Sequence, residues 1–357
     1  MSLIKVKSRG TDNVSGRRNL IINGAMSISQ RIGTTATAIT GGAYGIDRFF
    51  GYYSGNSWTT QQVADAPAGF YNSMKLAVTG TTTPTYSFFG QKIEGSNVNH
   101  IGLGTANCQS FTVSFYVKSS VAGIYSISVG NGAGDLAYPV QYTINSADTW
   151  ERKSMTIPAI TSGTWEVGTG TGIFLRFNMG SPSGRTDTAN GWRSGNFDGA
   201  DGSTGAVTWA TTSGATYNIT GVQLEVGDSV SDFEHRSAGE ELALCQRYFQ
   251  RTSSGGQVYF AVGHVWSSTL CQYGYTFPTR MRAHPSLSTS GTIQNLSMQS
   301  AVAVSSTAVD DYSGSGYTKG HVIKFNGNMS SSSYNTGYAC ALLLNSNGAY
   351  IQFDAEL

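Results

Sequence analysis

Apolar and polar residues alternate with a period of two over most of the chain. Phe111, Val113, Phe115 and Val117 are separated by single, mostly polar residues, which is the pattern of a half-buried β-strand. The same period recurs at 125–129, 140–144 and 222–226, and a denser apolar run covers 173–177. Clusters of Gly, Ser, Thr and Asn separate these segments. Short strands between such turns predict an all-β protein with a sandwich or barrel architecture.

One segment departs from this period. Ser237 and Glu240 have capping-box spacing, and Leu242, Cys245 and Phe249 recur on one helical face, which predicts a single linking helix near 238–250. The period of two returns over 257–357. There we predict a second, smaller β-sandwich that ends in a hairpin, with strands at 338–344 and 349–353 around Asn347-Gly348. The predicted domains are therefore an arm at 1–19, a sandwich at 20–236, and a helix plus C-terminal sandwich at 237–357.

Composition narrows the classes of function. Charged residues make up 12% of the 357 residues, against roughly 25% in ordinary soluble proteins, and the net charge is +1. Nucleic-acid binding depends on a large basic excess, so we expect no nucleic-acid partner. No apolar run reaches the length of a membrane span, so we expect no membrane insertion. The four cysteines include no pair with CxxC spacing, which argues against a zinc or redox site.

Catalytic motifs are missing from the sequence. None of the five histidines lies at metal-ligand spacing from another, and no HExxH, GxSxG or GxxxxGK[ST] motif occurs. We therefore expect no enzymatic activity, no cofactor and no metal. A polysaccharide depolymerase stays as an alternative, because two carboxylates suffice for glycoside hydrolysis and sequence cannot show which pair meets. Residues 196–202 offer oxygen ligands for calcium, but their spacing departs from the EF-hand pattern and the terminal Glu is absent, so an Asx-rich surface turn is the preferred interpretation and calcium the minor alternative.

Aromatic side chains indicate a glycan-binding function. A flat ring stacks on the apolar face of a sugar, while nearby polar groups bond its hydroxyls. Two clusters fit this pattern, and the candidate glycan-binding residues are Trp192, Arg193, Asn196, Tyr52, Tyr53 and Trp58. Two alternatives stay open. Trp192 could cap one end of the sandwich, and the residues of the second cluster could belong to the core or to an interface.

The first residues carry a cationic character that the rest of the chain lacks. The candidate attachment residues are Lys5, Lys7, Arg9, Arg17 and Arg18. They form either a solvated tail or a peptide that becomes ordered on a partner. Elsewhere, outward strand faces rich in Tyr, Ser, Thr and Gly but poor in charge favour side-by-side packing of identical subunits. We therefore expect an oligomer.

Several short segments of the sequence, taken together, indicate a protein family. They lie at the start of the chain, in its middle and at its end, and comprise residues 1–10, 18–26, 30–31, 47–49, 222–227, 233–237, 240–249, 277–285 and 353–357. In combination they resemble the tail-fibre and other virion structural proteins of tailed phages, in particular of the marine podovirus type. Residues 111–155 are also similar to the jelly-roll carbohydrate-binding modules that are attached to glycanases.

The resemblance implies a function in the virus particle. It implies a homotrimer of β-sandwich domains, assembled in the host cytoplasm into the virion, with an N-terminal stretch bound to other virion proteins. A jelly-roll domain at 20–236 would then mediate adhesion to host cell-surface glycans. The alternative is a capsid decoration, head-fibre or tail-connector protein that has no receptor. The family offers no catalytic motif to transfer to this chain.

Overall fold

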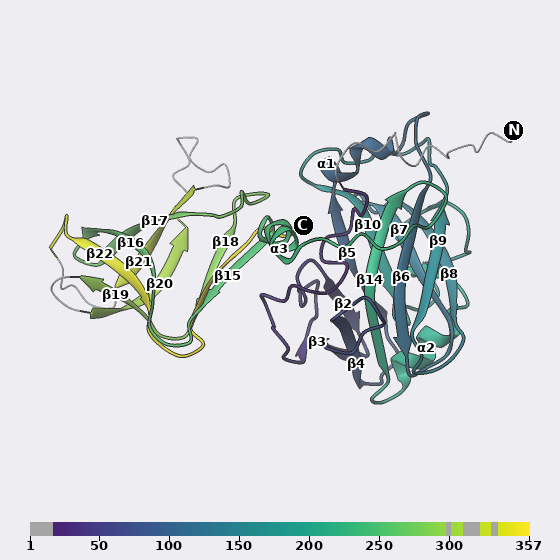
Figure 1. The fold of residues 1–357 in the computed structure, drawn as a ribbon, viewed down its shortest axis with the longest axis horizontal. Helices are drawn as coiled ribbons and strands as arrows, with labels where there is room; N and C mark the ends of the chain where they lie inside the picture. Colours follow the sequence, from purple (N-terminus) through teal and green to yellow (C-terminus); the bar gives the residue numbers. More distant parts are fainter. Residues whose placement is uncertain (1–16, 298–300, 310–321, 330–334) are drawn as a thin grey trace, which may run out of the picture. The chain divides into compact units, whose positions relative to one another are not determined.

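The chain divides into two compact units, Met1–Ala238 and Gly239–Leu357. The computed structural model describes residues 17–297, 301–309, 322–329 and 335–357 (Figure 1). Lys5, Lys7 and Arg9 lie outside the described residues. Strands dominate both units, which confirms the predicted all-β fold class.

The first unit is a jelly-roll β-sandwich made of two six-stranded sheets (Figure 1). The pairs that join the long strands within each sheet are antiparallel. In spatial order, one sheet contains β1 (Thr37–Ala38), β3 (Ser57–Val63), β4 (Ser73–Gly80), β14 (Thr216–Val226), β6 (Phe111–Ser119) and β9 (Glu151–Ile157). The other sheet contains β12 (Arg193–Ser194), β8 (Leu136–Ile144), β7 (Gly123–Asn131), β10 (Thr171–Asn178), β5 (Tyr86–Glu94) and β2 (Phe50–Ser54).

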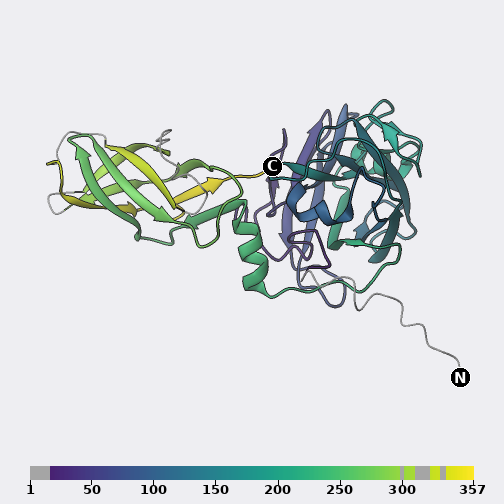
Figure 2. The same cartoon turned by 90° about the horizontal axis from the view of Figure 1, so that it is seen from above.

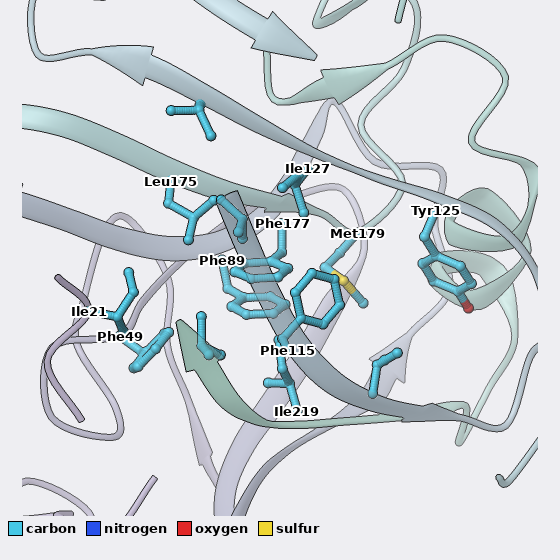
Figure 3. Close-up of a cluster of buried hydrophobic side chains, with 14 of the residues drawn as sticks. Ile21, Phe49, Phe89, Phe115, Tyr125, Ile127, Leu175, Phe177, Met179 and Ile219 are labelled. Atoms are coloured by element: carbon cyan, nitrogen blue, oxygen red, sulfur yellow. The ribbon is translucent and has the colours of Figure 1, made fainter. Parts of the chain in front are cut away.

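The predicted alternation places the core between the two sheets. Phe115 of one sheet contacts Phe177 of the other, with ring centroids 5.1 Å apart, and Phe177 stacks on Phe89 at 4.7 Å. All three rings are fully buried, and Figure 3 shows them at the centre of the cluster. Removing such apolar surface from water is the main stabilising term of the fold.

Short elements pack around the two sheets. In the helix at Thr204–Thr211, the side chain of Trp209 is fully buried in the core. These elements are α1 (Gly95–Val98), η2 (Asn99–Ile101), α2 (Thr204–Thr211) and the parallel pair of β11 (Thr186–Asp187) and β13 (Gly199–Ala200).

Polar side chains join the start of the first unit to its end. The Glu234 carboxylate accepts hydrogen bonds from the backbone N–H groups of Arg18 (3.0 Å) and Asn19 (2.7 Å). The Asn19 side-chain oxygen accepts from the Leu224 N–H at 3.1 Å, and Arg236 donates to the carbonyl oxygen of Asn19. We call Arg18, Asn19, Glu234 and Arg236 the clasp. Arg18 and Asn19 were assigned to the arm by sequence, but their contacts place them in the sandwich.

The second unit begins with helix α3 (Ala238–Gln246), which Figure 2 shows as the long coiled ribbon. A three-stranded sheet contains β15 (Phe249–Ser253), β23 (Tyr350–Asp354) and β18 (Ser286–Ser290). Six further strands close into a barrel in the order β16 (Val258–Ser267), β17 (Leu270–Thr276), β21 (Val322–Met329), β20 (Ala301–Val309), β19 (Ile293–Ser297) and β22 (Ala339–Leu344). Cys271, Cys340 and Leu342 lie in its core.

Two features of the second unit differ from the sequence predictions. The C-terminal sheets include a closed barrel, where a sandwich was expected. The predicted terminal hairpin is wrong, because β22 pairs with β16 and β19, while β23 pairs with β15 and β18. The turn between them contains Gly348 at a φ of 77°, as a reversal requires. This turn carries the chain from the barrel to the three-stranded sheet. The backbone N–H of Ser254 donates to the carbonyl oxygen of Ala349, and the Ser254 carbonyl oxygen accepts from the N–H of Gly348.

Candidate functional site

The outer face of one sheet of the sandwich carries an unusual set of side chains. On β5, Phe89 and Ile93 point into the core, so Phe88 and Lys92 point the other way. On β10, Phe174 pairs in register with Lys92 on this outer face. On β2, the alternation does the same for Phe50 and Tyr52. Phe50 and Phe88 are buried, yet they are not part of the core cluster between the sheets.

Six rings on this side form a continuous surface. We call them the aromatic face, which consists of Tyr44, Phe50, Tyr52, Tyr86, Phe88 and Phe174. Tyr52 stacks flat on Phe88, with centroids 5.6 Å apart and planes 5° apart, and contacts Tyr86 at 5.5 Å. Phe50 contacts Tyr44 at 5.6 Å and Phe174 at 5.4 Å. Tyr52 is 37% exposed, and Tyr44, Tyr86 and Phe174 are half-buried, so the edges of the face are open to ligand.

Cationic side chains lie over these rings. The Arg176 guanidinium is 3.7 Å from the centroid of Phe174, and the Lys92 ammonium is 5.7 Å from the centroids of both Phe50 and Phe174. Arg31 lies 5.3 Å from Tyr44, and Arg185 lies 6.0 Å from Tyr86. Cations at such distances are attracted by the negative faces of the rings. Arg31, Lys92 and Arg185 are half-buried, and their N–H groups give the face hydrogen-bond donors at its rim, whereas Arg176 is buried and bonds protein groups.

The loop at 181–203 fixes two of these cations. Arg176 donates to the Asn196 side-chain oxygen at 2.5 Å and to the carbonyl oxygen of Phe197 at 3.2 Å. Asp198 accepts two hydrogen bonds from Arg185, at 3.1 and 3.0 Å. Burial lowers the pKa of Arg176 to about 10, so it still carries its charge at neutral pH. Burial raises the pKa of Asp198, while the charge of Arg185 opposes that increase.

The structure separates the predicted glycan-binding residues into different environments. Tyr52 belongs to the aromatic face, and Asn196 reaches it through Arg176. Tyr53 and Trp58 do not belong to it, because they pack against each other at 4.8 Å inside the core. Trp58 is fully buried and Tyr53 is 8% exposed. The core alternative therefore describes these two residues, and we remove them from the candidate site.

Trp192 and Arg193 lie at the edge of the sandwich. The Trp192 ring contacts Tyr138 at 5.4 Å and Trp165 at 5.8 Å, and its indole N–H donates to the carbonyl oxygen of Pro158 at 3.0 Å. It is half-buried against the core, as the capping alternative requires. Arg193 begins strand β12 and donates to the carbonyl oxygen of Thr188 at 3.3 Å. The contacts of these two residues are thus with Tyr138, Trp165, Pro158 and Thr188, none of which belongs to the aromatic face.

Of the predicted attachment residues, Arg17 and Arg18 are described. Arg17 is exposed and lines a cavity of about 370 Å³ beside the clasp. Arg18 is held by the clasp, and its guanidinium also donates to the carbonyl oxygen of Asp232 at 2.6 Å. A second cavity, of about 360 Å³, is lined by Ser and Thr residues, by Asp201 and by the apolar side chains of Pro182, Ala200 and Val207. Neither cavity has a Phe, Tyr or Trp side chain in its lining, although the imidazole of His100 lines the first.

The oxygen ligands at 196–202 are engaged by protein groups. Asn196 binds Arg176, Asp198 binds Arg185 and Ser181, and Asp201 accepts a hydrogen bond from Thr186 at 2.5 Å. These contacts favour the surface-turn interpretation over a calcium site. Within the described ranges, no three His, Cys, Asp or Glu side chains lie close enough together to hold a metal ion.

Sequence reasoning missed most of the aromatic face. Phe88 and Phe174 lie in strands where apolar residues occupy successive positions, so the sequence does not show which of these residues face outward. The available signal was that Lys92 and Arg176 interrupt these two runs at outward-facing positions. A strand that is apolar on both faces but carries a cation on the outer one indicates an aromatic surface that is not entirely core.

Comparisons with known proteins leave the family open. No protein-family model and no curated protein matches the sequence. Solved structures that align with part of the chain include the enzymatically active domain of bacteriophage CBA120 tailspike protein 4 (15% identity, TM-score 0.33, covering 58% of this chain and 21% of that one). Another is a putative sugar binding protein from Bacteroides thetaiotaomicron (14% identity, TM-score 0.32, covering 59% and 100%).

A third is a family 11 carbohydrate-binding module of a Clostridium thermocellum cellulase (16% identity, TM-score 0.28, covering 58% and 99%). Alignments with TM-scores this low carry no conclusion about this chain. Among the described residues, the helices are too short or too polar to cross a membrane.

Proposed function

We propose that the protein binds polysaccharide through the aromatic face of its first unit. The observation that carries this proposal is the row of contacting rings with an exposed edge, bordered by Arg31, Lys92, Arg176 and Arg185. Aromatic residues that only fill a hydrophobic core do not require cations around them. A surface that only contacts water does not require a row of aromatic rings. Both features together suit a ligand with apolar faces and polar edges.

The chemistry of such a site is adsorption without reaction. The CH face of a pyranose ring would lie on Tyr52 or Phe174, while its hydroxyl groups would accept hydrogen bonds from the cations at the border. Because Asp198 already fixes the half-buried Arg185, little entropy of that side chain is lost when a sugar binds there. We propose a binding protein, and not an enzyme.

The sequence resemblance extends this proposal to a biological setting. The protein would be a virion fibre of a tailed phage, attached to other virion proteins through the residues that precede the clasp, and adhering to host-surface glycans. Weak single sites become useful when several copies bind together, so a homotrimer fits this function. The rival is a capsid decoration or tail-connector protein without a receptor.

Replacing a ring of the aromatic face tests the proposal. We expect Tyr52→Ala and Phe174→Ala to weaken binding to a polysaccharide extracted from host cells by about tenfold each, the loss of about 1.4 kcal/mol of stacking. Titration calorimetry with the purified chain measures this. Tyr71→Ala is the matched control, because Tyr71 is 80% exposed and has no recorded contact with the face.

Three outcomes would count against the proposal. Equal binding by the wild type and both face variants would remove the aromatic face as the site. Binding of the chain to purified capsids with no binding to any host glycan would favour the decoration protein. Loss of polysaccharide viscosity on incubation would identify a depolymerase.

A further inference from the structure

The barrel of the second unit exposes apolar side chains along one strand. On β16, Tyr259 is 64% exposed, Val262 75% and Trp266 58%, and the ring of His264 contacts that of Trp266 at 6.1 Å. We call Tyr259, Val262, His264 and Trp266 the barrel stripe. A single exposed apolar residue is ordinary, but three along one strand form a patch that monomeric proteins generally cover.

One neighbouring strand, β22, continues the apolar character of the stripe. In register, Tyr259 pairs with Leu343, Val262 with Ala341 and His264 with Ala339 on β22. Since directly paired residues project to the same side of a sheet, these β22 side chains border the stripe on the outside of the barrel. Leu343 is buried but does not belong to the barrel core, which agrees with this placement.

The strands of the barrel are also almost free of charge. Strands β16, β17, β19, β20 and β22 contain no Asp, Glu, Lys or Arg, and β21 contains only Lys324. Proteins normally place charges on outward strand positions to prevent association. A neutral surface can face its own copy without like-charge repulsion, whereas a surface of one sign cannot.

The size of the stripe suits the centre of an interface. A large aromatic side chain has about 150–250 Å² to bury, so the exposed fractions of Tyr259, Val262 and Trp266 leave on the order of 300 Å² of apolar surface. A stable interface buries about 800 Å² per partner, with an apolar centre and a polar rim. The turn residues Ser268 and Thr269, both exposed, extend from the end of the stripe as such a rim.

Two further observations favour a protein partner over a sugar. Val262 is the most exposed residue of the stripe, and an aliphatic side chain offers a sugar ring no stacking surface. The barrel is closed, so it presents no free strand edge for pairing with another chain. Association has to occur through outward side chains, and the stripe is where apolar ones gather.

From these observations we propose that the barrel stripe binds a second copy of this chain. The inference deepens the proposed function, because it rests on the expected oligomer and names the surface that holds it together. The stripes of neighbouring copies would bury Tyr259, Val262 and Trp266 against one another.

Sedimentation velocity of the full chain at several protein concentrations tests this. We expect the wild type to form an oligomer, and Val262→Glu to weaken its association at least tenfold, because each copy would bury an unpaired carboxylate. Ser288→Glu is the matched control, since Ser288 is exposed on β18, outside the barrel, and should leave association unchanged. The pair Val262→Ser and Trp266→Ser removes apolar surface without adding charge, in case the carboxylate disturbs folding.

The outcomes separate this inference from the proposed function. A wild-type chain that stays monomeric at every concentration overturns the inference, and so does an oligomer that all stripe variants retain. Retained assembly with lost polysaccharide binding in the stripe variants would make the stripe a glycan site and also overturn it. Polysaccharide binding that Tyr52→Ala weakens, in a chain whose stripe variants are monomeric, supports both proposals.

Discussion

Tyr52, Tyr53 and Trp58 show how closely a residue of the aromatic face and a core residue can be placed. Tyr52 and Tyr53 are adjacent on β2, and the strand period sends them to opposite faces of the sheet. Tyr53 meets Trp58 in the core, while Tyr52 meets Phe88 on the aromatic face. Both residues are tyrosines in the same strand, so residue type does not distinguish them. They differ in the face of the sheet to which each side chain points.

This difference predicts opposite effects of substitution. Trp58→Ala should lower the free energy of unfolding by about 3–5 kcal/mol, because it leaves a cavity where a fully buried ring packed. Tyr52→Ala should lower it by about 1 kcal/mol, since that ring is partly in water. Urea denaturation of the two variants measures both values. Similar losses of stability would show that Tyr52 is a core residue after all.

The candidate site was predictable from sequence only in part. The stacking argument found Tyr52 because aromatic residues cluster around it, and it found Asn196 because that residue lies in a polar loop. Phe88 and Phe174 were not found, because an apolar residue in an apolar strand gives no sign of which face it occupies. Their relation to Tyr52 depends on the pairing of β2, β5 and β10, whose sequence positions lie far apart.

At the scale of elements, the sequence predicted strands better than their partners. The period of two located β6, β7, β8 and β14 correctly, and the dense apolar run at 173–177 located β10, because the burial of a strand is visible in its own sequence. The terminal hairpin failed for a related reason. Asn347-Gly348 indicates that the chain reverses, but the partners of β22 and β23 are set by packing with strands elsewhere in the chain. Local turn chemistry therefore identifies a reversal without identifying a sheet.

The clasp is an element-scale contact with a predicted pH dependence. Burial tends to raise the pKa of Glu234, but the N–H groups of Arg18 and Asn19 and the charges of Arg236 and Arg18 outweigh it and hold the pKa below its ordinary value of 4.5. A lowered carboxyl pKa means that the contact stabilises the fold fully above pH 4.5. That stabilisation is lost as the pH falls through the lowered value.

Nuclear magnetic resonance of the Arg18 and Asn19 amide protons follows this titration. Both signals should move together with a midpoint below pH 4.5, and Glu234→Gln should abolish the transition. A midpoint at or above 4.5 would mean that burial outweighs the hydrogen bonds. The four clasp residues lie in two of the sequence segments that resemble phage virion proteins, 18–26 and 233–237. In the structure, these two segments are joined to each other by the hydrogen bonds of the clasp.

At the scale of the whole molecule, each unit has its own hydrophobic core. One described core cluster centres on Phe89, Phe115 and Phe177, and the other on Cys271, Leu342 and Phe353. The all-β class and the position of the helix followed from the sequence, since both depend on local periodicity. Closure of the second unit into a barrel did not, because it depends on the register of six strands at once.

Separate cores predict separate unfolding transitions. Leu342→Ala should lower the stability of the second unit by about 2–5 kcal/mol, because Leu342 is fully buried in the barrel. Differential scanning calorimetry of the full chain should then show one transition at lower temperature and the other unchanged. A shift of both transitions together would mean that the two units unfold as one.

The clasp also determines where a mechanical load is carried. A force that pulls on the residues before Arg17 and on those after Ala238 enters and leaves the first unit at neighbouring points, because Arg18 and Asn19 bind Glu234 and Arg236 there. Most of the tension then crosses a few hydrogen bonds and bypasses the twelve long and short strands of the two sheets. Tension along the chain would therefore strain the hydrogen bonds of the clasp first. The aromatic face, which lies on one of the sheets, would keep its shape while those bonds carry the load.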